Sequence, residues 1–574
     1  MRWAHFKILI LWVLLNSCSG VEVDFARSLA VPQPADIVLR NGKIITVDRD
    51  FSIKEAVAIK DGRFLAVGSE RDIRLLTGPR TRVVDLGGRT VIPGLIDSHI
   101  HATAAGITWD NELRWEQTRS LADGLTLIAS AVSRRPAGQW IVVGGGWDPI
   151  QFAERRFPTR EELDAIAPNH PVYLQYLGHG ALLNSAALTA AGITVKTIEP
   201  AGGKFERGPS GELTGWLQGL SAWQYAYNKI PRPSLERVRR SLGHCFQELN
   251  RVGLTSVADL HTAGVSFAHR RILADMAQRG ELTLRLNYYV APPGGGDESE
   301  QWRSAVAQIE QLPQSDQFRF IGFGATLLRG AGELLSNPDG IAIDTEAKEK
   351  LRRELRFFAQ GDYRFQLHAT HDDTARQLLD VVEQVHAVTP FKPQRVTFAH
   401  LESASAETIG RVEKLGGGIA VQDRLALAGE RYMNLSGEAK ARNAPPLRTM
   451  LDAGVSVGAG TDAFRSGNYS PMLSLWWLVT GKTMAGSALR AQSQNLTRAE
   501  ALRIYTMGSA WIIGEQRRRG SIETDKLADL VVLNADYLSV PADQIPTLES
   551  LLTMVGGRVV YFAKPFGPID IYRR

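Results

Sequence analysis

The middle of the chain alternates amphipathic helical stretches with short apolar runs, and this alternation constrains the fold more than any other feature. The stretch LERVRRSLGHCFQELNRVG precedes LTSVADLH, and AKEKLRRELRFFAQGD precedes YRFQLHATH. Helices that alternate with short buried strands build a parallel sheet, because each helix carries the chain back to the start of the next strand. We therefore predict an α/β core over residues 91–515.

Polar side chains follow these apolar runs at their carboxyl ends. His99 and His101 follow one run, and His368, His400 and Asp462 each follow another. In a TIM (β/α)8 barrel the carboxyl ends of all strands open on one face, where the active site lies. The sequence therefore predicts that these five side chains gather at the mouth of such a barrel.

The segment VIPGLIDSHIH, residues 91–101, ends an apolar run with two closely spaced imidazoles. In a strand, residues two apart point to the same side, so His99 and His101 aim at one point. Neutral imidazole is a good zinc ligand. The chain has only two cysteines, Cys18 and Cys245, so a cysteine-based metal site is excluded and a histidine-based site is favoured.

Both ends of the chain show short alternating strands separated by turns. Asn41-Gly42 and Asp61-Gly62 each interrupt such a pattern and predict two β-hairpins. SIETDKLADLVVLN and LLTMVGGRVVYFA are similar near the other end. We predict a small β-sandwich composed of residues 36–90 and 516–574. The Gly- and Pro-rich stretch from about 140 to 230 is interpreted as an irregular insertion over the barrel mouth.

The N-terminus has the layout of a signal peptide over residues 1–20, followed by a tether over 21–35. Arg2 and Lys7 precede the apolar stretch Ile8–Leu15 and then small residues. The segment LNSC resembles a bacterial lipobox, which would place a lipid on Cys18; ordinary secretion is the alternative. We predict an exported, periplasmic protein that touches a membrane only through that lipid.

Composition restricts the class of partner. The net charge is +5 over 574 residues, and no dense basic run with interleaved aromatic residues occurs. Nucleic-acid binding is therefore not expected, and a small-molecule substrate is. The sequence carries no signal of oligomeric state.

Several separated motifs carry a family resemblance. VIPGLIDSHIH resembles the first-strand motif of the amidohydrolase superfamily, and GSIETDKLADLVVL resembles its C-terminal strand signature. WIVVGGGWDP and GPSGELTGWL resemble the insertion of amidohydrolase family 3, the branch of N-substituted formamide deformylase-like enzymes. The resemblance runs from about Ala35 to Phe562.

The resemblance implies a distorted TIM barrel with a composite β-sandwich and metal-dependent hydrolysis of a C–N bond in an amide, N-formyl compound or cyclic amide. A divalent ion, with zinc preferred, would activate the attacking water. Asp462 would relay the proton and His400 would assist. The implied metal ligands are His99, His101, His368, His400 and Asp462. Two alternatives stay open, a heterocyclic-base deaminase and a catalytically silent binding lipoprotein.

One departure from the family pattern concerns the number of ions. Related enzymes with two metals carry a bridging lysine on the fourth strand, but FRFIGFGATLLRGAGELL contains none, and Gly322 or Gly324 takes its place. We therefore expect one ion, with a second ion bridged by Glu333 as the alternative.

Other polar residues are given lesser roles. Asp97 is expected to orient the histidines, and His179 and Trp147 to contact substrate. Asp259 and His261 are interpreted as structural. Cys245 lies on a helical pattern and is expected to be a buried, inert thiol.

Overall fold

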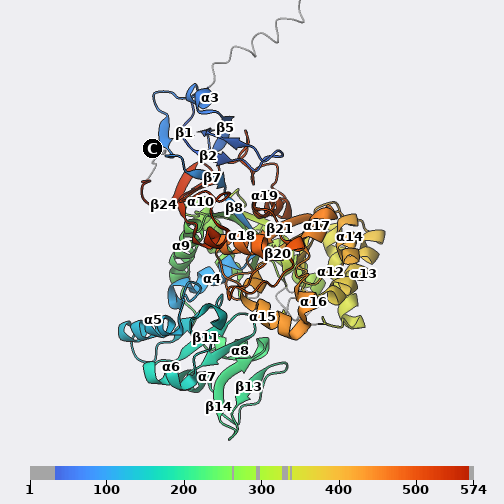
Figure 1. Ribbon diagram of the computed structural model, residues 1–574. Helices are drawn as coiled ribbons and strands as arrows, with labels where there is room; N and C mark the ends of the chain where they lie inside the picture. The colour runs from blue at the N-terminus through green and yellow to red at the C-terminus, as the bar shows by residue number, and fades with distance from the viewer. Residues whose placement is uncertain (1–32, 262–263, 292–297, 326–333, 336–338, 568–574) are drawn as a thin grey trace, which may run out of the picture.

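The computed structural model describes residues 33–261, 264–291, 298–325, 334–335 and 339–567. The expected signal peptide, Cys18 and Glu333 lie outside these residues, as does most of the tether. Figure 1 shows a central barrel with a β-sandwich at one end and a separate α/β unit at the other. Within the described ranges, no helix combines the length and apolarity needed to cross a bilayer.

An eight-stranded parallel sheet forms the centre and confirms the predicted barrel. Its first and last strands meet where Asp462 N donates to His99 O at 2.9 Å and His101 N donates to Ala463 O at 2.8 Å. Figure 1 shows helices surrounding this sheet. In sheet order the strands are β21 (Ser456–Gly460), β20 (Gly418–Gln422), β19 (Val396–His400), β18 (Arg364–Ala369), β17 (Phe318–Ala325), β16 (Arg285–Val290), β15 (Leu254–His261) and β8 (Leu95–Ile100).

The barrel helices form where apolar residues recur at helical spacing. In α9 (Leu235–Arg251), Val238, Leu242 and Phe246 are buried, and Ser234 caps the N-terminus by accepting a hydrogen bond from Arg237 N. The other helices of this part are α4 (Ala102–Thr108), α10 (Phe267–Gln278), α11 (Glu298–Glu310), α12 (Thr345–Gln360), α13 (Asp372–Val388), α14 (Ala406–Lys414), α15 (Arg424–Ser436), α16 (Glu438–Ala441), α17 (Leu447–Asp452), α18 (Pro471–Thr480), α19 (Arg498–Arg503) and α20 (Ser509–Ile512).

The sandwich combines both ends of the chain, as predicted. One sheet pairs β7, from the N-terminal part, with β22, from the C-terminal part. Buried Ile37, Val57 and Leu530 belong to the core between the two sheets. The first sheet contains β24 (Arg558–Phe562), β23 (Ser550–Val555), β22 (Leu530–Leu533), β7 (Thr90–Pro93), β2 (Lys43–Ile45) and β3 (Ile53–Lys54), and the second contains β5 (Arg63–Gly68), β4 (Ala56–Lys60), β1 (Ile37–Arg40) and β6 (Arg82–Asp85).

Only one of the two predicted hairpins forms. β4 and β5 pair around Asp61 and Gly62, which both have positive φ, as a type I′ turn requires. The prediction at Asn41-Gly42 is wrong, because β1 and β2 belong to different sheets. Asn41 has a positive φ of 55°, but Gly42 does not, so this segment carries the chain between the two layers.

The insertion is regular, which corrects the interpretation of it as irregular. Its sheet begins with β9, well before residue 140, and apolar cores cover both faces. Ile141 and Val143 face one core and Val142 the other. The strand order is β13 (Lys204–Arg207), β14 (Leu213–Gln218), β12 (Gly180–Leu183), β11 (Val172–Tyr176), β10 (Ile141–Val143) and β9 (Glu112–Leu113), and the helices are α5 (Leu121–Arg134), α6 (Arg160–Ile166), α7 (Ser185–Ala191) and α8 (Leu220–Tyr227).

Candidate metal centre

The barrel brings the five predicted ligands together from four strand ends. His99 lies in β8 with His101 directly after it, His368 lies in β18, and His400 is the last residue of β19. Asp462 follows β21 by two residues. All of these strands run parallel, so their carboxyl ends share one mouth.

The imidazole rings lie close enough to share a ligand. The ring centroid of His99 is 4.9 Å from that of His368, 5.2 Å from that of His400 and 5.6 Å from that of His101. Asp462 Oδ1 lies 3.5 Å from His99 Nε2 and 3.2 Å from His101 Nε2. Two triads with metal-binding geometry result, and His99 belongs to both: His99–His368–His400 and His99–His101–Asp462.

Several ring nitrogens at this point lack hydrogen-bond partners in the described part of the protein. Both nitrogens of His99 and Nε2 of His368 are buried without a hydrogen bond. Buried polar atoms are otherwise almost always satisfied, since an unmet hydrogen bond costs roughly 1–3 kcal/mol. Burial also lowers the pKa of His368 and His400 well below the usual value, which keeps these imidazoles neutral. Neutral, unpartnered nitrogens fit a divalent metal ion.

Hydrogen bonds on the far side of two rings fix their tautomers. His101 Nδ1 donates to the Leu260 carbonyl at 2.8 Å, and His400 Nδ1 donates to Gln422 Oε1 at 2.6 Å. The Nε2 atom of His400 is then left with its lone pair, whereas Nε2 of His101 lies 3.2 Å from Asp462 Oδ1. Gln422 is a contributor that the sequence analysis did not identify.

Asp97 contacts the backbone of His99 rather than an imidazole ring. It accepts hydrogen bonds from His99 N at 2.9 Å and from Thr461 Oγ1 at 2.6 Å, so it joins β8 to the end of β21. Burial raises its pKa to about 7, although the bonds from Thr461 and His99 oppose this shift.

The Asp462 carboxylate is held in its ionised form. Burial alone would raise its pKa, but the imidazoles of His101 and His99, which lie 3.2 and 3.5 Å from Oδ1, keep the pKa well below the usual value. The guanidinium of Arg424 contributes too, with Nη1 3.7 Å from Asp462 Oδ2, while Nη2 donates to Glu402 at 2.6 Å. Arg424 was not among the predicted site residues. It nevertheless lies just after the carboxyl end of β20, in the same position relative to its strand as the predicted ligands.

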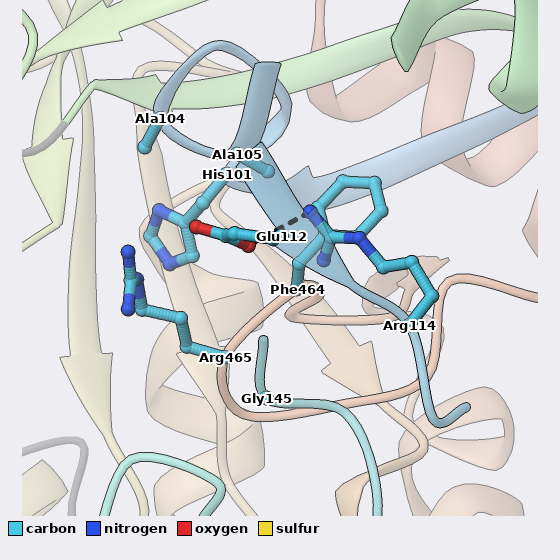
Figure 2. Close-up of a pocket in the computed structure, with 8 residues that line it drawn as sticks. All are labelled: His101, Ala104, Ala105, Glu112, Arg114, Gly145, Phe464 and Arg465. Atoms are coloured by element: carbon cyan, nitrogen blue, oxygen red, sulfur yellow. Dashed lines mark hydrogen bonds and ion pairs between the residues drawn. The ribbon is translucent and has the colours of Figure 1, made fainter. Parts of the chain in front are cut away.

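A small pocket adjoins His101, one of the predicted metal ligands, at the contact between the barrel and the insertion (Figure 2). Close backbone approach shapes it, because a Cβ on Gly145 would lie 2.7 Å from Arg465 Cα. The sequence analysis identified only His101 among its lining residues. The pocket is lined by His101, Ala104, Ala105, Glu112, Arg114, Gly145, Phe464 and Arg465.

Two remaining candidates, Trp147 and His179, are not among the residues that line this pocket. Trp147 is buried in the core of the insertion, with its ring centroid 4.9 Å from that of Trp115. His179 lies in the turn between β11 and β12, with its ring centroid 6.3 Å from that of Tyr176.

The residues expected to be structural are buried, and Asp259 and His261 are hydrogen-bonded to each other. Asp259 accepts hydrogen bonds from His261 Nε2 at 2.9 Å and from Thr103 N at 3.2 Å, near the start of α4. Cys245 is a buried free thiol on α9, and burial raises its pKa.

Comparisons with known proteins agree with this architecture. The sequence model of the amidohydrolase family matches residues 82–561. The N-substituted formamide deformylase of Arthrobacter pascens is 31% identical over 553 residues, which cover 92% of this chain and 99% of that protein.

Two solved structures share the fold. An uncharacterized metal-dependent hydrolase from Pyrococcus horikoshii OT3 superposes with a TM-score of 0.64 at 21% identity, over 88% of this chain and 99% of that chain. An adenosine deaminase from Xanthomonas campestris with bound zinc superposes with a TM-score of 0.51 at 16% identity, over 92% of this chain and 93% of that chain.

Proposed function

The chain belongs to the amidohydrolase family, and from this premise we propose that it is a metal-dependent hydrolase of a C–N bond in a small molecule. The observation that carries the proposal is the convergence of four histidines and Asp462 at the barrel mouth, with buried ring nitrogens that make no hydrogen bond among the described residues. Similarity to N-substituted formamide deformylase over nearly the whole chain supports N-formyl compounds, alongside other amides and cyclic amides, as substrates.

His99, His101, His368 and Asp462 would hold one divalent ion, with zinc our first choice for imidazole and carboxylate ligands. Bound there, such an ion supplies an acidified water molecule and positive charge beside the scissile carbonyl. The described strand β17 contains no lysine, which supports one ion over a lysine-bridged pair. Two ions joined by a bridging carboxylate, with His368 and His400 among the ligands of the second ion, are the competing arrangement.

Asp462 is the proposed general base and then the general acid. Its ionised carboxylate accepts a proton from the attacking water as the new C–O bond forms. It then delivers that proton to the nitrogen as the C–N bond breaks. His400 presents Nε2 as an acceptor, because its Nδ1 donates to Gln422, so it is placed to orient the attacking water. Arg424 holds the second oxygen of Asp462.

The test is elemental analysis of the purified protein beside a variant carrying His99→Ala and His101→Ala. We expect about one equivalent of transition metal in the wild type and none in the variant. Release of amine from N-formyl compounds or amides should follow the metal. Ammonia released only from adenine or aminopyrimidines would replace the amide proposal with a deaminase. Absence of metal after reconstitution with Zn²⁺, Mn²⁺ and Fe²⁺ would favour a silent scaffold.

We also propose that the protein is exported to the periplasm, either lipidated on Cys18 or simply secreted. The support is the N-terminal pattern alone: a basic start, the apolar stretch Ile8–Leu15 and the LNSC segment. Labelling cells with a radioactive fatty acid should mark the wild type and not Cys18→Ala. Unlabelled protein in the periplasm would indicate simple secretion, and unlabelled protein in the cytoplasm would contradict export.

A further inference from the structure

We propose that Arg465 binds a carboxylate of the substrate, so that the enzyme acts on N-formyl or N-acyl amino acids, or on similar anionic amides, in preference to neutral ones. This inference rests on the proposed function and narrows its substrate class. The sequence motifs do not predict a role for Arg465.

Arg465 is placed next to the reaction centre. It follows Asp462 by three residues, in the loop after β21, and it lines the same pocket as the metal ligand His101. Figure 2 shows the side chains of His101, Glu112 and Arg465 around this pocket. A substrate carbonyl beside the metal ligands would therefore lie close to the pocket that Arg465 lines.

The guanidinium of Arg465 has hydrogen-bonding capacity that its neighbours do not use. Nη2 donates to Tyr227 OH at 2.6 Å, and Nη1 donates to Gln175 Oε1 at 3.4 Å. The guanidinium carbon also lies 4.4 Å from the ring centroid of Tyr227. A guanidinium has about five N–H donors, so donors remain for an added acceptor.

Charge distinguishes Arg465 from the second arginine in the pocket. Arg114 Nη2 pairs with Glu112 Oε2 at 2.8 Å, and Arg114 Nη1 lies 3.5 Å from Glu116 Oε1. The other oxygen of Glu112 accepts a hydrogen bond from Thr108 at 2.6 Å. Among the ion pairs of the described residues, Arg465 has no carboxylate within 4.0 Å. It is the cation that an incoming anion can neutralise, and planar guanidinium groups match carboxylates in a two-point contact.

A purely structural role is the competing explanation. Through Tyr227, Arg465 joins the loop after β21 to α8 of the insertion, so its loss could merely loosen this contact. Tyr227→Phe is the matched control, because it removes the hydroxyl acceptor and keeps both the aromatic ring and the cation. Arg465→Lys keeps the charge and removes the planar fork.

The first experiment compares hydrolysis of N-formylphenylalanine and N-formylphenethylamine, which differ by one carboxylate. We expect the wild type to favour the anionic substrate at least tenfold in kcat/KM. Arg465→Gln should lower kcat/KM about 50-fold for the anion and less than threefold for the neutral amide. For the anionic substrate, kcat/KM of Arg465→Lys should lie between the values of the wild type and Arg465→Gln. Tyr227→Phe should change kcat/KM less than threefold for either substrate. Equal losses for both substrates in Arg465→Gln, or a wild type that prefers the neutral amide, would overturn the proposal.

The second experiment does not depend on hydrolysis. Calorimetric titration of the metal-loaded protein with 3-phenylpropanoate and with 3-phenylpropanol compares an anionic and a neutral probe. We expect the anion to bind the wild type at least tenfold tighter than it binds Arg465→Gln. Binding of the carboxylate to the metal instead of to Arg465 would be unchanged in the variant. Equal binding to the two proteins, or no binding to either, contradicts the subsite. Arginine-dependent binding without hydrolysis of any amide would refute the proposed reaction and leave the subsite standing.

Discussion

The two ends of the barrel differ in whether their buried polar groups have partners within the protein. At the end that meets the sandwich, Arg285 makes a two-point contact with Asp529 at 2.9 and 3.0 Å, and Gly556 N also donates to Asp529. Both side chains are about 5% exposed or less. At the mouth, both ring nitrogens of His99 and Nε2 of His368 have no hydrogen bond among the described residues.

A second network strengthens the contrast. Glu515 accepts from Arg319 Nη1 at 2.6 Å through one oxygen and from Arg519 Nη2 at 2.8 Å through the other. Buried charges persist only when they are paired, so these groups have a structural purpose that the protein itself fulfils. The groups at the mouth form the candidate metal site instead. A candidate metal site is therefore marked by several unpartnered imidazole nitrogens clustered with a carboxylate, rather than by burial or charge alone.

The largest effect should come from removing the ligand shared by both triads. We expect His99→Ala to lose its bound metal and more than about 10³-fold of the hydrolytic rate, because metal supplies the reactive water. Elemental analysis and rate measurement test this. His244→Ala is the control, since His244 is exposed and pairs with Asp110. If His99→Ala retained metal at the wild-type level, the unpartnered groups at the mouth would not be the metal site.

Asp462→Asn separates proton transfer from metal binding at the same mouth. Loss of a general acid–base group costs about 10²–10⁴-fold in rate, and we expect a value near the middle of that range. The metal content should fall less than in His99→Ala, because the imidazoles remain. A variant with full activity would show that another group moves the proton.

At the opposite end, Asp529→Ala should destabilise the fold and leave the chemistry intact. Breaking one partner of a buried ion pair costs about 3–5 kcal/mol, because Arg285 is left charged and unpaired. Urea unfolding measures the loss, and the folded fraction should keep its metal. The paired change Arg285→Met with Asp529→Leu should recover most of the stability. A loss of metal in folded Asp529→Ala would show that the two ends are coupled.

Glu116 lies between the barrel and the insertion, and its carboxyl group is buried with only a partial charge partner. Burial raises its pKa to about 7, although the charge of Arg114 opposes the shift. The folded state therefore holds the proton more tightly than the unfolded chain, and unfolding releases it between its ordinary pKa of 4.5 and about 7. The stability should fall as pH rises through this window, by up to about 3 kcal/mol.

Glu116→Gln removes that titration. We expect the variant and the wild type to have similar unfolding free energies at pH 4.5, with the variant the more stable at pH 8. Parallel pH profiles for the two proteins would mean that Glu116 is ionised in the folded state throughout.

Much of the architecture followed from local patterns. The helix–strand alternation predicted the barrel, and residues at the ends of its strands predicted the gathering of the five ligands. These inferences succeed because the carboxyl ends of parallel strands must share one face. The hairpin at Asn41-Gly42 failed because turn residues do not specify whether the next strand joins the same sheet. The insertion was judged irregular because it is rich in Gly and Pro. Its strands β10 and β11 are buried on both faces and lack the alternation that marks a strand in a sequence.

Periodicity and short motifs along the chain were enough to predict the fold class, the family and the candidate metal ligands. The surroundings of those ligands depend on contacts between distant segments, which form only on folding. Gln422 orients His400, and Arg424 approaches Asp462, through contacts between neighbouring strands of the barrel. Arg465 has no ion-pair partner among the described residues, whereas Glu112 in the same pocket is paired with Arg114. Such roles depend on the charges that remain after folding, and no spacing along the chain encodes them.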